Sequence, residues 1–201
     1  KILIFAKFSL KFPDKKKILL FDENLEFFLM KYIPKSKYSV LFSRSKNYNI
    51  LIILKLLTKF KFSQLNYFNE YIKYVVPKVV LTFSDNYPIF YKLKVPSKPK
   101  KIFAQAAYRT ASKDDVFFYS KNLKKIKKLN KVDEMLVFNK KIGDKYKNFI
   151  NGNIRIIGSF KSNAFKVNLK KKKYDILYIS SWRDRNKDWK LTDTVDLQKI
   201  I

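Results

Sequence analysis

KVVLTFSDN, residues 78–86, decides the fold, because an uninterrupted apolar run ends abruptly in three polar residues. The run does not alternate apolar with polar side chains, so it is typical of a parallel strand buried on both faces. KIFAQ (residues 101–105) and NIRIIGSFKSN (residues 153–163) have the same form. Ligands bind to an open parallel sheet where strands end and helices begin, so the pattern predicts three polar turns that converge on one crevice.

Strand-like and helix-like segments alternate along the chain. This alternation predicts an α/β, Rossmann-like fold with a mostly parallel sheet and helices on both faces. The predicted strands cover residues 17–22, 38–43, 78–83, 101–104, 134–139 and 153–157, and the predicted helices cover residues 23–33, 47–60, 64–74 and 140–150.

A lysine-dense stretch with few large apolar side chains spans residues 166–173 and precedes a further strand-like run. We therefore expect a Rossmann-like N-terminal domain over residues 1–165, a basic linker over 166–173, and the beginning of a second α/β domain over 174–201. The chain begins with Lys1, and its end at Ile201 completes no recognisable element. We expect a fragment that lacks the C-terminal part of the protein.

Composition excludes several kinds of chemistry. The chain has 45 Lys or Arg residues against 16 Asp or Glu, a formal net charge of +29, and neither Cys nor His. Disulfides, thiolate nucleophiles, imidazole bases and the usual zinc ligands are therefore excluded, and acid–base chemistry must use carboxylates, Tyr or Lys. No apolar run reaches the roughly 20 residues that a spanning helix needs, so we expect a cytoplasmic protein.

The positive charge has more than one interpretation. A basic surface attracts phosphate, which favours a nucleic-acid-binding module as the non-enzymatic alternative. Only five of the basic residues are Arg, however, and Lys, Ile, Asn, Phe and Tyr are enriched together, as the codons of an AT-rich genome would produce. We therefore expect no nucleic-acid partner. Peripheral contact with an anionic membrane at its inner face stays open, with the basic amphipathic segment 121–131 as a candidate.

The polar turns provide the candidate site residues, although each turn could also be a helix cap or a bend. Asp85 is the candidate catalytic residue, because a carboxylate can accept a hydroxyl proton. Neither the phosphate-binding pattern GxxxxGK[ST] nor the dinucleotide pattern GxGxxG occurs. The candidate substrate-binding residues supply amide, hydroxyl or cationic groups and are Asn86, Gln105, Arg109, Ser159, Lys161, Asn163 and Arg183.

The order and spacing of LTFSDNY, IFAQ, IRIIGSFKSN and ILYISSWR resemble those of bacterial surface carbohydrate biosynthesis proteins, glycosyltransferases of the GT-B type. The resemblance spans nearly the whole chain. It implies two Rossmann-like domains that face each other across a cleft, with the nucleotide-sugar donor bound mainly by the C-terminal domain. The reaction would transfer a sugar to a glycan or lipid-linked acceptor whose hydroxyl Asp85 activates or orients, without a metal or a bound cofactor.

One departure from the family concerns the turn after residue 104. The family pattern is Gln-Asn-Gly, whereas this chain has Gln105-Ala106-Ala107, which removes a polar arm and a residue that readily takes positive φ. A nucleotide-sugar epimerase and a polyol-phosphate transferase are alternatives on the same fold, since a fold does not determine function. If the donor domain is missing, the chain alone is expected to be inactive.

Overall fold

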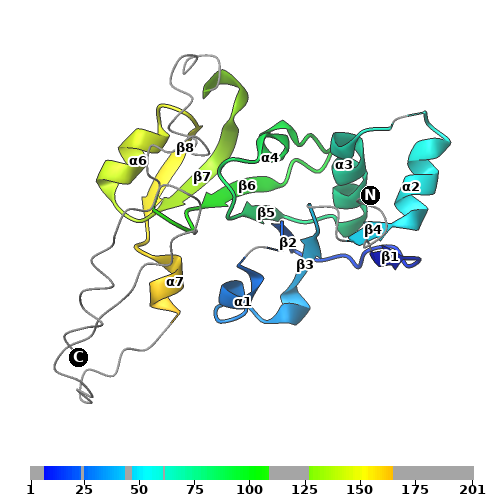
Figure 1. Ribbon diagram of the computed structural model, residues 1–201, viewed down its shortest axis with the longest axis horizontal. Helices are drawn as coiled ribbons and strands as arrows, with labels where there is room; N and C mark the ends of the chain where they lie inside the picture. The colour runs from blue at the N-terminus through cyan, green and yellow to red at the C-terminus, as the bar shows by residue number, and fades with distance from the viewer. Residues whose placement is uncertain (1–6, 24, 44–46, 61, 109–126, 165–201) are drawn as a thin grey trace, which may run out of the picture. The chain divides into compact units, whose positions relative to one another are not determined.

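The computed structural model describes residues 7–23, 25–43, 47–60, 62–108 and 127–164 (Figure 1). The predicted linker and the predicted second domain lie outside these residues, so that division of the chain stays a prediction.

Within the described residues, six strands form one sheet in the order β3-β2-β5-β6-β7-β8. Each neighbouring pair is parallel, so all the carboxyl ends lie at the same edge. The chain moves from β2 outward to β3, returns to β5 on the other side of β2, and then continues to β8. The direction of winding therefore reverses between β2 and β5, which creates a topological switch point. The strands are β2 (Ile18–Phe21), β3 (Tyr38–Leu41), β5 (Val79–Thr82), β6 (Lys100–Ala104), β7 (Lys131–Val137) and β8 (Asn151–Ile156).

Helices cover both faces of this sheet, which confirms the predicted α/β, Rossmann-like architecture (Figure 1). One face packs against α2, α3, α4 and α6, and the other against α1 and α7. The helices are α1 (Glu26–Leu29), α2 (Ile50–Leu57), α3 (Gln64–Val75), α4 (Pro88–Lys92), α6 (Lys140–Tyr146) and α7 (Phe160–Asn163).

The side chains of β2 show why its sequence does not alternate. Leu19 and Phe21 lie in the core cluster on one face, Leu20 lies in the cluster on the other, and all three are 0% exposed. Full burial of a Leu or Phe side chain stabilises the fold by about 1.5–3 kcal/mol. A strand covered on both faces gains this at every position, so the chain contains uninterrupted apolar runs. The prediction of a buried strand over residues 153–157 was wrong, because β8 is an edge strand in which no residue is buried.

The prediction of a helix over residues 47–60 was wrong at its beginning. Asn47–Asn49 instead form β4, which pairs in parallel with β1 (Lys7–Ser9) in a separate two-stranded sheet. The Asn49 side chain accepts a hydrogen bond from the backbone N of Ile52 at 3.2 Å, which caps α2 and sets its first residue.

The helix predicted over residues 23–33 is also shorter than expected, because α1 has only four residues. Leu25 precedes it with φ of 65°, a left-handed conformation that cannot continue a right-handed helix. The chain therefore enters the helix through a turn, and this turn places the preceding residues at the carboxyl end of β2.

Glu70 joins α2 to α3 through two ion pairs. Its buried carboxylate accepts from Lys55 Nζ of α2 at 2.7 Å and from Lys73 Nζ of α3 at 3.1 Å. Burial alone would raise the pKa of the carboxyl group, but the hydrogen bonds and charges of the two lysines outweigh burial and hold the pKa of Glu70 below its usual value.

We expect Glu70→Gln to lower the free energy of unfolding at pH 7 by about 1–2 kcal/mol, because charge-assisted hydrogen bonds are lost. The folded-state pKa is depressed, so the carboxylate stabilises the fold above its unfolded value near 4.5, and this contribution is lost as the pH falls through the folded pKa. Urea unfolding should therefore give a difference between the two proteins that shrinks below about pH 4. A difference that is constant from neutral to acidic pH would contradict this account.

Gly152 of β8 lies against β7. A Cβ atom at this position would lie 2.7 Å from both Cγ2 and the backbone O of Val132. We expect Gly152→Ala to lower the free energy of unfolding by about 1–3 kcal/mol, since the backbone would have to shift. Urea unfolding measures the effect, with the exposed Asn148→Ala as a control that should stay within about 0.5 kcal/mol of the parent protein. An unchanged midpoint for Gly152→Ala would argue against this close approach.

Candidate functional site

The carboxyl edge of the sheet carries a row of buried polar side chains. Each lies within three residues of the end of one of four adjacent strands, and none is more than 6% exposed: Ser43 after β3, Asp22 after β2, Ser84 and Asp85 after β5, and Gln105 after β6. Burial of an uncompensated polar group costs about 1–3 kcal/mol, so apolar packing does not account for this row. Its position matches the place where open α/β sheets bind ligands.

A side-chain contact bridges the switch point between β2 and β5. Ser84 Oγ donates to Asp22 Oδ2 at 3.4 Å. The backbone N of Asp22 donates to Leu41 O of β3 at 2.9 Å, and Asp22 has φ of 85°, a region that Asp tolerates better than most residues. Asp22 is therefore held in an uncommon backbone conformation at the centre of the edge.

Asp85, the predicted catalytic residue, is held from two helices. Tyr146 of α6 donates its hydroxyl hydrogen to Asp85 Oδ2 at 2.6 Å, and Tyr91 of α4 donates to the Asp85 backbone O at 2.6 Å. Asp85 does not cap the helix that follows it, because the N-cap residue of α4 is Tyr87 and no side chain caps that helix. Tyr146 thus orients the Asp85 carboxylate and Tyr91 holds its backbone, while the adjacent Asn86 is exposed.

Gln105 joins the ends of two strands. Its Oε1 accepts from the backbone N of Phe138 at 3.0 Å, and its Nε2 donates to Ala107 O at 3.0 Å. These contacts give the buried side chain a role in holding the turn. Ala106 and Ala107 do not adopt positive φ, so the turn forms here without the glycine of the family pattern.

The third predicted turn, which begins at Gly158, packs against the chain next to the first predicted turn. Phe160, the first residue of α7, places its ring 4.8 Å from that of Phe83 at the end of β5 and 4.9 Å from that of Tyr32. Tyr32 also donates its hydroxyl hydrogen to Phe160 O at 2.9 Å. The fold thus brings residues that are far apart in the sequence to the same edge of the sheet, as we expected from the prediction of parallel strands.

The predicted binding residues of α7 have local partners. Ser159 is the N-cap and accepts from the backbone N of Ser162 at 3.2 Å, while Asn163 Nδ2 donates to Ile157 O at 3.1 Å. Lys161 Nζ lies 6.0 Å from the centre of an aromatic ring of α1. The capping interpretation therefore holds for Ser159. Two other candidates, Arg109 and Arg183, lie outside the described residues.

Three residues of this edge were missed by the sequence analysis. Asp22 and Ser43 follow the runs ILLF and SVLF in the way that Ser84 follows its strand, so the same rule applied to every strand would have found them. Tyr146 is 61 positions from Asp85, and no sequence pattern connects the two.

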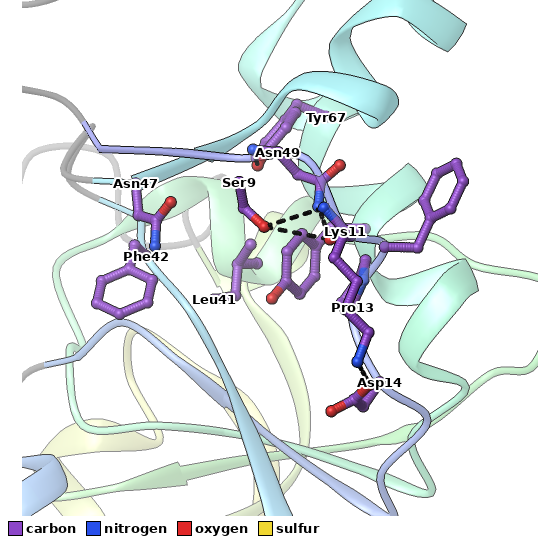
Figure 2. A pocket seen from close by; sticks show the side chains of 11 residues that line it. Ser9, Lys11, Pro13, Asp14, Leu41, Phe42, Asn47, Asn49 and Tyr67 are labelled. Carbon is purple, nitrogen blue, oxygen red and sulfur yellow. Dashed lines mark hydrogen bonds and ion pairs between the residues drawn. The ribbon is translucent and has the colours of Figure 1, made fainter.

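A cavity of about 200 Å³ lies beside the carboxyl end of β3 (Figure 2). Figure 2 shows Phe42 and Asn47 on one wall and Lys11, Pro13 and Asp14 on the opposite wall. The lining combines hydroxyl, amide, carboxylate and ammonium groups with aromatic rings. Its polar members are Ser9, Lys11, Asp14, Asn47, Asn49, Tyr67 and Tyr71.

The two tyrosines of this cavity are hydrogen-bonding groups rather than bases. Burial is the largest influence on Tyr67 and raises its pKa to about 12, although its oxygen accepts from the backbone N of Asn49 at 2.8 Å. Burial also raises the pKa of Tyr71, which donates to Val40 O at 3.2 Å. Both hydroxyls therefore keep their hydrogens at neutral pH.

Ser43 follows Phe42 of the cavity wall in the chain but does not itself line the cavity. Its backbone O accepts from Gln64 Nε2 at 3.1 Å and from the Tyr87 hydroxyl at 3.0 Å. Its Oγ is buried and has no hydrogen-bond partner among the residues that the structure describes. A buried hydroxyl in this state is costly unless a ligand supplies the partner.

Comparison with known proteins gives a family match over the second half of the chain. Residues 102–201 match the model of a family described as "putative O-antigen biosynthesis protein". The match supports a role in surface polysaccharide biosynthesis. No curated protein and no solved structure gives a significant match.

In the described part of the chain, no helix is long and apolar enough to cross a membrane, and no group of three or more acidic side chains could hold a metal ion.

We expect Ser43→Ala and Ser84→Ala to have opposite effects on stability. The first removes a buried hydroxyl that has no described partner and should raise the free energy of unfolding by a few tenths to about 1 kcal/mol. The second removes the hydrogen bond to buried Asp22 and should lower it by about 1 kcal/mol. Urea unfolding of the two matched variants tests this, and a loss of stability in Ser43→Ala would show that its hydroxyl has a partner.

Proposed function

We propose that the protein is a glycosyltransferase of surface polysaccharide biosynthesis that moves a sugar from a nucleotide-sugar to a glycan or lipid-linked acceptor. Residues 1–165 would form the acceptor-side domain of a GT-B-type enzyme. The observation that carries the proposal is the row of buried polar side chains across the switch point, from Ser43 through Asp22 to Asp85. The family match supports the polysaccharide context.

The chemistry of the edge favours an acceptor over a nucleotide. Its groups are carboxylates, hydroxyls and an amide, which suit sugar hydroxyls, and the phosphate-binding and dinucleotide-binding patterns do not occur in the sequence. The adjacent cavity of about 200 Å³ is smaller than the ~300–1,000 Å³ of pockets that hold drug-sized ligands, so it suits one sugar ring better than a whole nucleotide-sugar.

In the proposed reaction, Asp85 takes the proton from an acceptor hydroxyl while the oxygen of that hydroxyl attacks the anomeric carbon of the donor. The bond from the anomeric carbon to the nucleotide breaks, and the nucleotide leaves with the bonding electrons. Tyr146 would act as a positioning residue, since its 2.6 Å hydrogen bond orients the carboxylate. No bound cofactor or metal enters this proposal, and Arg109 and Arg183 stay candidates for binding anionic groups.

Asp85→Asn in the full-length protein is expected to retain the fold and to lower kcat/KM by about 10²–10⁴-fold, because the general base is lost. Tyr146→Phe should lower kcat about tenfold with little change in the acceptor KM, since only the orientation of the carboxylate is affected. The measurement is sugar transfer from a panel of nucleotide-sugars to lipid-linked and soluble glycans. Thermal unfolding checks that both variants fold.

The exposed Asp144→Asn on α6 is the matched control, because it removes a carboxylate without touching the sheet edge, and it should transfer at the parent rate. Undiminished turnover in Asp85→Asn would remove Asp85 from the mechanism. Release of an epimerised nucleotide-sugar, or transfer of a polyol phosphate, would replace the glycosyltransferase assignment with one of the alternatives on this fold.

A further inference from the structure

Helix α2 has apolar side chains on the side that faces solvent. Its sequence, ILIILKLL, contains one polar residue, and the helix buries Ile52 and Leu56 against the core. Leu54 and Leu57 are nevertheless 52% and 42% exposed. A surface helix normally carries polar residues on its outer face, and a helix that is apolar all round is normally buried. The outer face of α2 is therefore as apolar as a surface that is normally buried against other apolar groups.

The residues that follow α2 extend this apolar surface. Phe60 is 87% exposed and Phe62 is 63% exposed. An apolar groove of about 350 Å³ lies beside Phe62, between the helix and the first turn of α3. We call the exposed residues Leu54, Leu57, Lys59, Phe60 and Phe62 the α2 surface.

The exposed charge of the chain segment that carries the α2 surface is only positive. The sequence contains no Asp or Glu between Glu26 and Glu70, while Lys recurs throughout this stretch. Glu70 does not offset the charge at the surface, because it is buried and paired with Lys55 and Lys73. Lys59 is exposed next to the two phenylalanines. Figure 1 places α2 beside β1 and β4, beyond edge strand β3, and Lys7 of β1 is exposed as well. The exposed Lys11 that follows β1 is paired with the exposed Asp14 at 3.4 Å and adds no net charge.

We propose that the α2 surface docks on an anionic lipid bilayer. Its leucines and phenylalanines would enter the boundary between headgroups and acyl chains, and its lysines would pair with anionic headgroups. A second copy of the chain fits less well, because two such cationic surfaces repel each other. Nucleic acid would use the charge but would leave the apolar side chains exposed. The proposal does not depend on the glycosyltransferase assignment.

The location of this surface differs from the one that the sequence suggested. Segment 121–131 was the earlier candidate for membrane contact, and residues 121–126 of it lie outside the described residues. Leu129, in the described part of that segment, is 56% exposed and provides a direct comparison between the two locations.

The test is flotation of the full chain with phosphatidylcholine vesicles, with and without phosphatidylglycerol, at increasing salt. The parent protein should bind only the anionic vesicles, and binding should weaken as salt screens the lysines. The double variant Phe60→Ser with Phe62→Ser should bind about tenfold more weakly, because the inserted apolar area is lost. Lys59→Glu should weaken binding by about tenfold or more, since one Lys near an anionic surface contributes about fivefold and reversal adds repulsion.

The matched controls change the same kinds of side chain, apolar and cationic, at positions outside the α2 surface. Leu129→Ser with Ile156→Ser removes two exposed apolar side chains, and Lys145→Glu reverses an exposed charge on α6; both should bind like the parent protein. Circular dichroism verifies the fold of each variant. The proposal is overturned if the parent protein does not float with anionic vesicles, if the α2 variants float like the parent, or if the Leu129 control loses binding instead. The proposal is also overturned if the Phe60→Ser, Phe62→Ser variant binds vesicles like the parent protein and differs from it only in oligomeric state, as measured by sedimentation.

Discussion

β2 pairs in parallel with β3 on one side and with β5 on the other, and both edges of this strand are therefore occupied inside the sheet. Everything else in the domain depends on this pairing. It buries Leu19, Leu20 and Phe21 completely, and it requires the chain to cross from one side of β2 to the other. The crossing creates the switch point, and parallel pairing directs the end of every neighbouring strand to the same edge. The candidate site is thus a consequence of how the sheet is wound.

Two different arrangements hold the polar groups of this edge. Asp85 is anchored by hydroxyl groups from helices on one face, whereas Phe83, two residues before it, packs against α7 on the other face. Ser43, by contrast, has a buried Oγ without a partner in the described structure. A rigid carboxylate and, across β2 from it, a costly hydroxyl suit preorganised binding, because the fold supplies the position and a ligand would supply the missing hydrogen bond.

Much of the fold could be predicted from the sequence, because strands buried on both faces produce short apolar runs that end in polar residues. The same reasoning placed Asp85 and Gln105 at strand ends and grouped their turns at one edge. It could not find the β1–β4 sheet, since a three-residue strand such as Lys7–Ser9 has no pattern of its own. It could not connect Tyr146 with Asp85 either, because that contact depends on how α6 packs over the sheet. The late start of α1, at Glu26, results from positive φ at Leu25, a residue type that rarely adopts it.

Gln105 continues the sheet by means of its side chain. Its backbone N still donates to Leu136 O, as a residue in a parallel ladder does. In a continued ladder the first amide after β7, that of Phe138, would donate to the Gln105 carbonyl, but here it donates to Oε1 of the Gln105 side chain. The carboxamide thus provides one more rung after the backbone has turned away. Register between β6 and β7 is maintained past the end of the strand, so the residues that follow Gln105 can change in sequence while the edge of the sheet keeps its geometry.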